Sequence, residues 1–187
     1  MIKKILLGIG VLILIVAGYV GYMMLTTRSH SPASVAEFKD GDFLIQVNYC
    51  QPFRKGRLIF GTEAEGALVP FGKKWRTGAN EATEISFSKD VMMDGRLLKA
   101  GRYSLYTIPN DSDWTVVFNS NLGYWGAKLG GDPFEESKDV MRVSATVRND
   151  LPEIEQFTIS LTPADSLVNM HFYWETTRAT LLIQRVQ

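Results

Sequence analysis

The chain has 187 residues, of which 45% are hydrophobic and 21% are charged, a composition typical of one globular domain with an additional segment. The formal net charge is zero, but from Ser29 onward 17 basic residues (20 minus Lys3, Lys4 and Arg28) stand against 20 acidic ones, a net charge of about −3. Proteins that bind nucleic acid normally carry a basic stripe, and the sequence shows none, so we expect no nucleic-acid partner.

The N-terminal part of the chain contains a long apolar segment. Residues 5–25 (ILLGIGVLILIVAGYVGYMML) include no charged side chain, and these 21 residues are enough to cross the hydrocarbon core of a membrane as a helix. A cleaved signal peptide is the alternative, and SVA at Ser34–Ala36 offers a cleavage site. The apolar core of a signal peptide usually has only about 7 to 15 residues and ends in small residues, whereas this segment is longer and ends in bulky ones. The sequence therefore predicts an uncleaved, single-pass membrane anchor.

The charges around this segment predict its orientation. Lys3, Lys4 and the amino terminus lie on one side of it and Arg28 lies on the other, and the more positive side normally stays in the cytoplasm. Residues 1–4 are therefore expected in the cytoplasm. The rest of the chain is expected at the cell membrane's periplasmic or exterior side.

The residues after the anchor have the composition of a linker. Residues 26–41 (TTRSHSPASVAEFKDG) contain Pro32 and few large apolar side chains. We predict an irregular linker there, with His30 exposed. An extracytoplasmic β-domain is predicted over residues 42–187.

From Asp42 onward, apolar residues recur at every second position, which is the period of a strand. The clearest hairpin signal is Asp94-Gly95 between two alternating runs, because both positions of a two-residue hairpin turn accept positive φ. Strands are predicted over 42–49, 84–93, 96–108, 113–119, 139–148, 153–162, 167–175 and 178–186. Since no amphipathic helix follows the anchor, the fold class is predicted to be all-β, an antiparallel β-sandwich or jelly-roll-like domain.

Two further features follow from this pattern. Within residues 167–175, the apolar side chains share one face and His171 lies on the opposite, solvated or half-covered face. The longest loop is predicted at Ser120–Ser137, which holds four glycines and no alternating run. Long loops on a rigid β-scaffold are common places for function.

The sequence offers little for catalysis or metal binding. Cys50 is the only cysteine, so it cannot form an internal disulfide, and its place in an alternating run predicts buried packing. The only histidines are His30 and His171. Motifs for nucleophilic hydrolases, zinc proteases and phosphate-binding loops are absent from the sequence. We therefore predict no catalytic residue, no metal site and no cofactor.

The most polar stretch of the domain, residues 73–90 (KKWRTGANEATEISFSKD), runs into a predicted strand. Gly78 can take turn conformations closed to other residues, and Arg76 offers a planar fork of donors that matches a carboxylate. With Glu81 or Glu84 as its partner, Arg76 would form a structural corner that fixes the start of the strand.

A ligand-binding site is the second interpretation of this stretch. The ring of Trp75, with two aromatic residues from the glycine-rich loop, would form a platform for a sugar, and nearby polar groups would bind its hydroxyls or a carboxylate. The candidate ligand-binding residues are Trp75, Arg76, Asn80, Glu81, Tyr124 and Trp125. Catalysis by Glu81 and Glu84 as a carboxylate pair is the third interpretation, which their spacing weakens because two extended residues three positions apart face opposite ways.

Several stretches of the domain also carry a family resemblance. They are KGRLIFG (55–61), LVPFGKKWRTGANEATEISFSKDV (68–91), LKAGRYSLYTIP (98–109), WTVVFN (114–119) and YWGA (124–127). Together they resemble a bacterial envelope family catalogued as domain of unknown function 2911, and the resemblance covers most of residues 49–185. It implies an envelope-facing, β-rich domain and brings no catalytic residues. The family more usually has a Ser/Arg-Pro-Ser run ahead of Lys-Gly-Arg, where this chain has CQPFR at Cys50–Arg54.

These observations predict a membrane-anchored, extracytoplasmic β-sandwich. Its expected role is that of a non-catalytic binding or assembly module of the bacterial envelope, with a glycan or an envelope protein as partner. The alternative is a hydrolase that acts on an envelope polysaccharide through a carboxylate pair.

Overall fold

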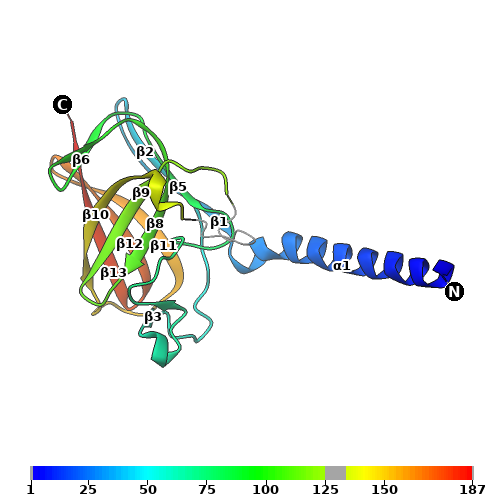
Figure 1. Cartoon of the computed structure of the whole chain (residues 1–187). Helices are drawn as coiled ribbons and strands as arrows, with labels where there is room; N and C mark the ends of the chain where they lie inside the picture. The colour runs from blue at the N-terminus through cyan, green and yellow to red at the C-terminus, as the bar shows by residue number, and fades with distance from the viewer. Residues whose placement is uncertain (1, 125–133, 187) are drawn as a thin grey trace.

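The computed structural model describes residues 2–124 and 134–186. The helix α1 (Ile2–His30) projects from the β-domain and carries the N-terminus away from it (Figure 1). Its 29 residues extend about 43 Å at 1.5 Å per residue. The segment Leu6–His30 is long and apolar enough to cross a membrane, and an 18-residue window within it has a mean hydropathy of 2.3. This helix is therefore a candidate membrane anchor or signal sequence.

The β-domain is built on one continuous antiparallel sheet. The strand order is β1-β2-β5-β8-β9-β10-β13-β12-β11, and the β6-β7 hairpin joins it through β13. The strands of this sheet are β1 (Ala33–Asp40), β2 (Phe43–Cys50), β5 (Thr83–Phe87), β6 (Val91–Met93), β7 (Arg96–Leu98), β8 (Gly101–Pro109), β9 (Asp113–Asn119), β10 (Asp139–Arg148), β11 (Ile154–Ala164), β12 (Leu167–Glu175) and β13 (Thr177–Arg185). A separate parallel pair comprises β3 (Phe60–Gly61) and β4 (Val69–Pro70), and short 3-10 helices lie at Glu63–Glu65 and Glu136–Lys138.

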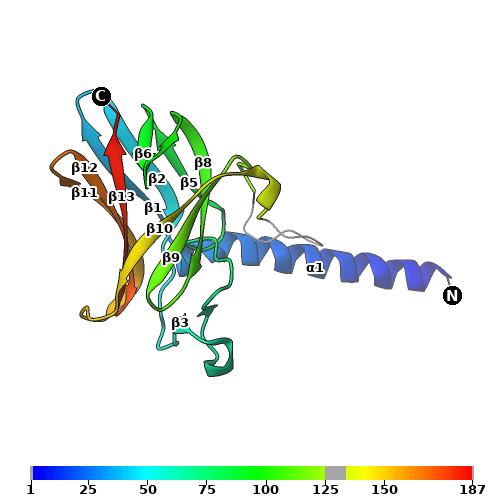
Figure 2. The ribbon, with the colours of Figure 1, turned by 60° about the vertical axis from the view of Figure 1, so that its left-hand side comes forward.

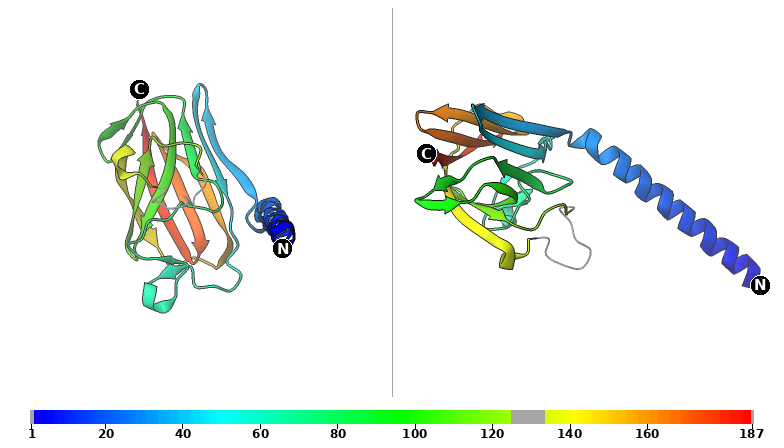
Figure 3. Two further views of the ribbon diagram at one scale, coloured as in Figure 1. Left: turned by 45° about the vertical axis from the view of Figure 1, so that its right-hand side comes forward. Right: turned by 90° about the horizontal axis from the view of Figure 1, so that it is seen from above.

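This sheet folds into two layers that face each other across the core. β10 forms the corner between them, because it pairs with β9 along most of its length and with β13 only at its end (Figure 2). Seen from above, the blue and orange strands lie in one layer and the green strands in the other (Figure 3). The edge strands β1 and β11 lie next to each other. The predicted all-β antiparallel sandwich is confirmed, and its two layers belong to one open sheet.

Backbone bonds join the two edges of the sheet at one end. The segment after β2 bonds to β11, from Arg54 N to Glu155 O (2.7 Å) and from Phe157 N to Pro52 O (3.0 Å). The Tyr49 hydroxyl adds a bridge, since it accepts from Ile159 N at 3.0 Å. The chain after Cys50 is thereby held against the opposite edge.

The strand predictions hold where alternation is strict. β9, β10 and β12 have the predicted bounds, and Asp94 (φ 49°) and Gly95 (φ 70°) form the predicted turn between β6 and β7. Beyond this hairpin, β5 pairs antiparallel with β8, as expected for the same two runs. The apolar face predicted for β12 is confirmed, because Val168, Met170, Phe172 and Trp174 are all at most 1% exposed.

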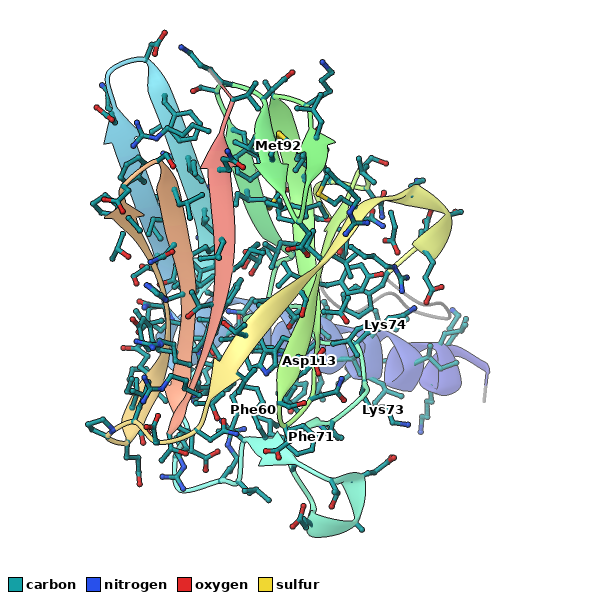
Figure 4. All side chains as sticks on the ribbon, turned by 90° about the vertical axis from the view of Figure 1, so that its left-hand side faces the viewer. Phe60, Phe71, Lys73, Lys74, Met92 and Asp113 are labelled. Atoms are coloured by element: carbon teal, nitrogen blue, oxygen red, sulfur yellow. The ribbon has the colours of Figure 1, made fainter. Side chains whose placement is uncertain are left out.

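An aromatic cluster fills the core near β3. It contains Phe60, Trp75, Trp114, Phe157 and Trp174. Trp75 stacks on Trp174, with ring centroids 5.7 Å apart and an interplanar angle of 21°, and meets the edge of Phe157 at 4.9 Å. Figure 4 shows Phe60 and Phe71 at this end of the sandwich and Met92 at the opposite end. Such packing stabilises the fold by dispersion and by removal of apolar surface from water.

The structure differs from the expected linker at residues 26–41. Helix α1 continues to His30, and residues 33–40 form β1, which pairs with β2 from Ala33↔Cys50 to Asp40↔Phe43. The strand was missed because only Ala36 of its residues is buried, so no apolar alternation marks it. Its order comes from the neighbouring strand.

The environment of His171 also differs from the prediction. The side chain lies on the face of β12 opposite Trp174, as expected, but that position is buried instead of solvated or half-covered. Its ring nitrogens lie 3.1 Å from Thr162 Oγ1 and 3.0 Å from Thr180 Oγ1, on the two neighbouring strands. Burial lowers the pKa of His171, and the two hydroxyls satisfy its neutral ring. His171 therefore connects β12 to β11 and β13 through side-chain hydrogen bonds.

Candidate functional site

The polar stretch before β5 forms a tight corner against β2. Gly78 has φ +151°, and a Cβ placed there would lie 2.9 Å from Cys50 O and 3.1 Å from Thr83 Oγ1. The Thr83 hydroxyl donates to Thr77 O at 2.8 Å, and the Thr77 hydroxyl donates to Thr107 Oγ1 at 3.1 Å. Only glycine fits this approach of two backbones. The close approach at Gly78 and the threonine hydrogen bonds therefore hold the corner in place against β2.

The same corner holds the C-terminal end of α1. Arg28 Nη2 lies 2.8 Å from Glu81 Oε1, and Asn80 Nδ2 donates to Ser31 O at 3.2 Å. Only Ser31 and Pro32 separate the helix from β1. Glu81 thus contacts the helix, and Asn80 contacts the residue that follows it.

The ion pair expected within the corner is absent from the described residues. Glu81 pairs with Arg28, and Glu84 pairs with Arg102, so neither carboxylate reaches Arg76. Arg76 is half-buried and donates from Nη1 to Asn80 O at 3.3 Å. Burial lowers the pKa of its guanidinium. The prediction of an Arg76–Glu81 or Arg76–Glu84 pair is wrong, because β5 turns Glu84 toward β8 and the helix supplies the cation for Glu81.

Two cavities flank the corner, one on each side. The first, which we call the junction cavity, has a volume of about 520 Å³ and lies between the end of α1, β1, β2 and the start of β5. Its lining residues are Arg28, Ala33, Ser34, Val35, Asn48, Tyr49, Cys50, Glu81, Ala82, Glu84, Gly123 and Tyr124. A cavity of this size accommodates a small organic molecule or one to a few sugar units.

Polar groups in the junction cavity are held by defined partners. Gly123 N donates to Glu84 Oε1 at 2.9 Å, and Ala82 N donates to Tyr124 O at 3.1 Å, so the loop after β9 is tied to the start of β5. The hydrogen bond from Arg28 lowers the pKa of Glu81. Glu81 is therefore an anion, with acceptor oxygens for hydroxyl or ammonium groups.

The thiol of Cys50 also borders this cavity. It is free and buried, and its Sγ donates to Glu81 Oε2 at 3.4 Å. Burial, and then the bond to this carboxylate, raise the pKa of Cys50. A thiol held protonated in this way is a poor nucleophile. The predicted buried packing of Cys50 is confirmed.

The second cavity, which we call the basic cavity, lies on the other side of the corner and has a volume of about 510 Å³. Its lining residues are His30, Ser31, Pro52, Phe53, Lys55, Arg57, Leu68, Val69, Trp75, Arg76, Gly78, Ala79, Asn80 and Trp174. Three of them are permanent cations, and the lining contains no carboxylate. The sequence prediction missed Lys55 and Arg57, although both lie in the KGRLIFG stretch that carried the family resemblance.

The structure thus divides the predicted site residues. Trp75, Arg76 and Asn80 line the basic cavity, whereas Glu81 and Tyr124 line the junction cavity. Trp75 packs mainly into the aromatic core, and Tyr124 borders the other cavity, so these two rings do not form one platform. Trp125 lies outside the described residues. Arg28, which was assigned to the linker, was missed as a site residue because its partner is 53 positions away.

Groups of histidine, cysteine and carboxylate residues arranged to hold a metal ion are absent from residues 2–124 and 134–186. A comparison with curated proteins and one with solved structures gave no match. A family model described as "Protein of unknown function (DUF2911)" matches residues 31–183, from the residue after α1 almost to the end of β13. The match covers the β-domain up to Ile183, including the corner and all cavity-lining residues except Arg28 and His30. The chain therefore belongs to the DUF2911 family.

Proposed function

We propose that this protein is a membrane-anchored binding module of the bacterial envelope, which holds a glycan in the junction cavity. Helix α1 anchors it, with residues 1–4 in the cytoplasm and the β-domain on the periplasmic or exterior side. The observation that carries the proposal is the cavity itself, which lies where the anchor meets the domain and combines the Tyr124 ring with oriented carboxylates.

The lining of the cavity suits a sugar. Rings of sugars pack against aromatic side chains, and their hydroxyls donate to carboxylates and exchange bonds with amides and hydroxyls. Tyr124 supplies the ring, Glu81 and Glu84 supply acceptors, and Asn48 supplies an amide. The backbone bonds at Gly123 and Tyr124 fix these groups before a ligand arrives, which reduces the entropy cost of binding.

A hydrolase is the second candidate, because Glu81 and Glu84 line the same cavity in spite of their spacing. Hydrolysis of a glycosidic bond requires one carboxyl that stays protonated near neutral pH as the general acid. The hydrogen bond from Arg28 instead lowers the pKa of Glu81, which keeps this carboxyl ionised. Glu84 already accepts from Gly123 N and pairs with Arg102. Binding therefore fits the electrostatics better than catalysis.

The binding proposal is tested with the full-length protein in detergent micelles on an array of bacterial cell-wall and capsular polysaccharide fragments. We expect one class of fragment to bind, and Tyr124→Ala to weaken its binding about fivefold, because a lost ring contact is worth on the order of 1 kcal/mol. Tyr173→Ala is the matched control, a half-buried tyrosine on β12 outside the cavity. Equal losses in the two variants would contradict the site. Release of reducing ends that disappears in Glu84→Gln would favour the hydrolase.

The anchor is tested by alkaline extraction of membranes. We expect the protein to stay in the membrane after a high-pH carbonate wash and to keep its N-terminus, because residues 5–25 are uncharged and Tyr19 and Tyr22 suit an interface. Cleavage after Ala36 would cut β1 in the middle of its pairing with β2. A soluble form that begins near Glu37 would show a cleaved signal sequence instead.

A further inference from the structure

The basic cavity is a second site, on the opposite side of the corner from the junction cavity. We propose that it binds a phosphate group, and that the source of this group is the headgroup of an anionic lipid in the membrane that holds α1. This inference rests on the proposed anchoring of α1, but it does not depend on glycan binding in the junction cavity.

The lining of the basic cavity has an excess of positive charge. Most cations of the domain have a carboxylate partner, as in Lys99–Asp90 and Arg148–Asp150. The side chains of Lys55, Arg57 and Arg76 form no ion pair among the described residues, and all three line one cavity. The nearest carboxylate contact is made by the backbone, where Lys55 N donates to Glu155 Oε1 at 2.9 Å, and Glu155 does not line the cavity. A concentration of positive charge without neutralising carboxylates attracts an anion, and the low dielectric of a recess strengthens that attraction.

Arg57 and Arg76 have guanidinium donors that are not used within the described part of the protein. Arg76 is half-buried, and within residues 2–124 and 134–186 its guanidinium makes one hydrogen bond, from Nη1 to Asn80 O, so most of its donors remain for a ligand. Arg57 is positioned by bonds from Nε to Arg54 O (2.8 Å) and from Nη2 to Phe53 O (2.6 Å), and its Nη1 remains. Planar guanidinium groups bind phosphate oxygens in a bidentate manner, which makes phosphate the best match to this pair.

The basic cavity lies close to the end of the apolar run of α1. His30 lines the cavity and lies five residues beyond the end of the apolar run at Leu25, a rise of about 7 Å. A bilayer has a hydrocarbon core of about 30 Å and a total thickness of about 40 to 45 Å, so each headgroup layer is about 5 to 7 Å deep. With residues 5–25 across the core, His30 and the cavity wall beside it lie at headgroup level. Lipid phosphate is therefore the nearest and most abundant anion.

The experiment uses the full-length protein in neutral detergent micelles and counts retained lipid by native mass spectrometry. The probes are phosphatidylglycerol, phosphatidylcholine of the same chain length, and inorganic phosphate. Binding of inorganic phosphate is followed by the total tryptophan emission, to which Trp75 and Trp174 at the cavity wall contribute. We expect phosphatidylglycerol to bind and phosphatidylcholine to bind at least tenfold more weakly, because its choline charge is repelled by the cationic lining.

Substitutions locate the site. Arg57→Gln and Lys55→Gln are expected to weaken phosphatidylglycerol binding about fivefold each, the usual effect of one cation near a lipid surface. Arg76→Gln is expected to weaken it at least tenfold, and Arg76→Lys by an intermediate factor, since lysine keeps the charge and loses the fork. Lys39→Gln is the control, because Lys39 is exposed on β1, away from the cavity. Lys55 and Arg57 are also exposed, so their variants test the site even if the Arg76 variants unfold.

Each outcome decides the proposal. Selective retention of phosphatidylglycerol that falls in the cavity variants and not in Lys39→Gln supports a lipid phosphate site. Binding of inorganic phosphate at the cavity without retention of phosphatidylglycerol overturns the lipid source and assigns the site to a free phosphate. Equal losses in Lys39→Gln and the cavity variants show attraction by overall charge only and overturn the site.

Discussion

Replacement of Gly78 by alanine is expected to lower the free energy of unfolding of the β-domain by about 4 kcal/mol. The added Cβ would lie 2.9 Å from Cys50 O and 3.1 Å from Thr83 Oγ1. Neither neighbour can move freely, because Cys50 is part of β2 and the Thr83 hydroxyl is bonded to Thr77 O. Unfavourable φ costs about 1 to 3 kcal/mol, and overpacking adds about as much.

Gly66→Ala is the matched control for this experiment. Gly66 also has positive φ (+74°), but a Cβ there would have no atom within 4 Å. Its substitution is expected to cost only about 1 kcal/mol, the penalty of the backbone conformation. Urea unfolding of the full-length protein in micelles measures both. Similar values for the two variants would show that the close approach at Gly78 contributes nothing.

Removal of the Trp75 ring is expected to have a comparable effect. Trp75→Ala should destabilise the domain by about 3 kcal/mol and lower its Tm by on the order of 10 °C, because the ring packs between Trp174, Phe157 and the rest of the aromatic cluster. In the ligand-platform interpretation, the ring would contribute to binding and little to folding.

Tyr124→Ala separates these interpretations. The half-buried Tyr124 belongs to a loop, and its removal is expected to change the Tm much less than the removal of Trp75. Differential scanning fluorimetry of the two variants and the parent protein gives the comparison. A Trp75→Ala protein that has the Tm of the parent protein but loses glycan binding would show that Trp75 belongs to the ligand site.

The fold could be predicted where local pattern and tertiary environment agree. In β12, each apolar residue in the alternating run is buried, and at Asp94-Gly95 the turn chemistry alone fixes the connection. β1 could not be found in this way, because it is an edge strand whose pairing with β2 supplies its order. Two-residue strands such as β3 carry no periodic signal at all.

The candidate site was less accessible to sequence reasoning. The sequence marked the polar stretch as a candidate site, but the partners of its side chains were sought within the stretch. The carboxylate of Glu81 binds Arg28, from a segment whose composition predicted a linker. Lys55, Arg57 and Arg76 meet in one cavity only because the chain after β2 is held against β11. Contacts of this kind depend on chain topology, which spacing does not encode.

The short connection between α1 and β1 limits how far the β-domain can travel. Ser31 and Pro32 span at most about 7 Å. The Arg28–Glu81 and Asn80–Ser31 contacts restrict the movement of the domain relative to the helix further. A flexible tether of 16 residues, as the composition suggested, would let the domain search a radius of about 20 to 24 Å. Under the proposed anchoring by α1, the domain would instead stay at the membrane surface and sample only what diffuses to that surface or is already embedded in it. The proposed binding function would then be limited to ligands in the layer next to that membrane.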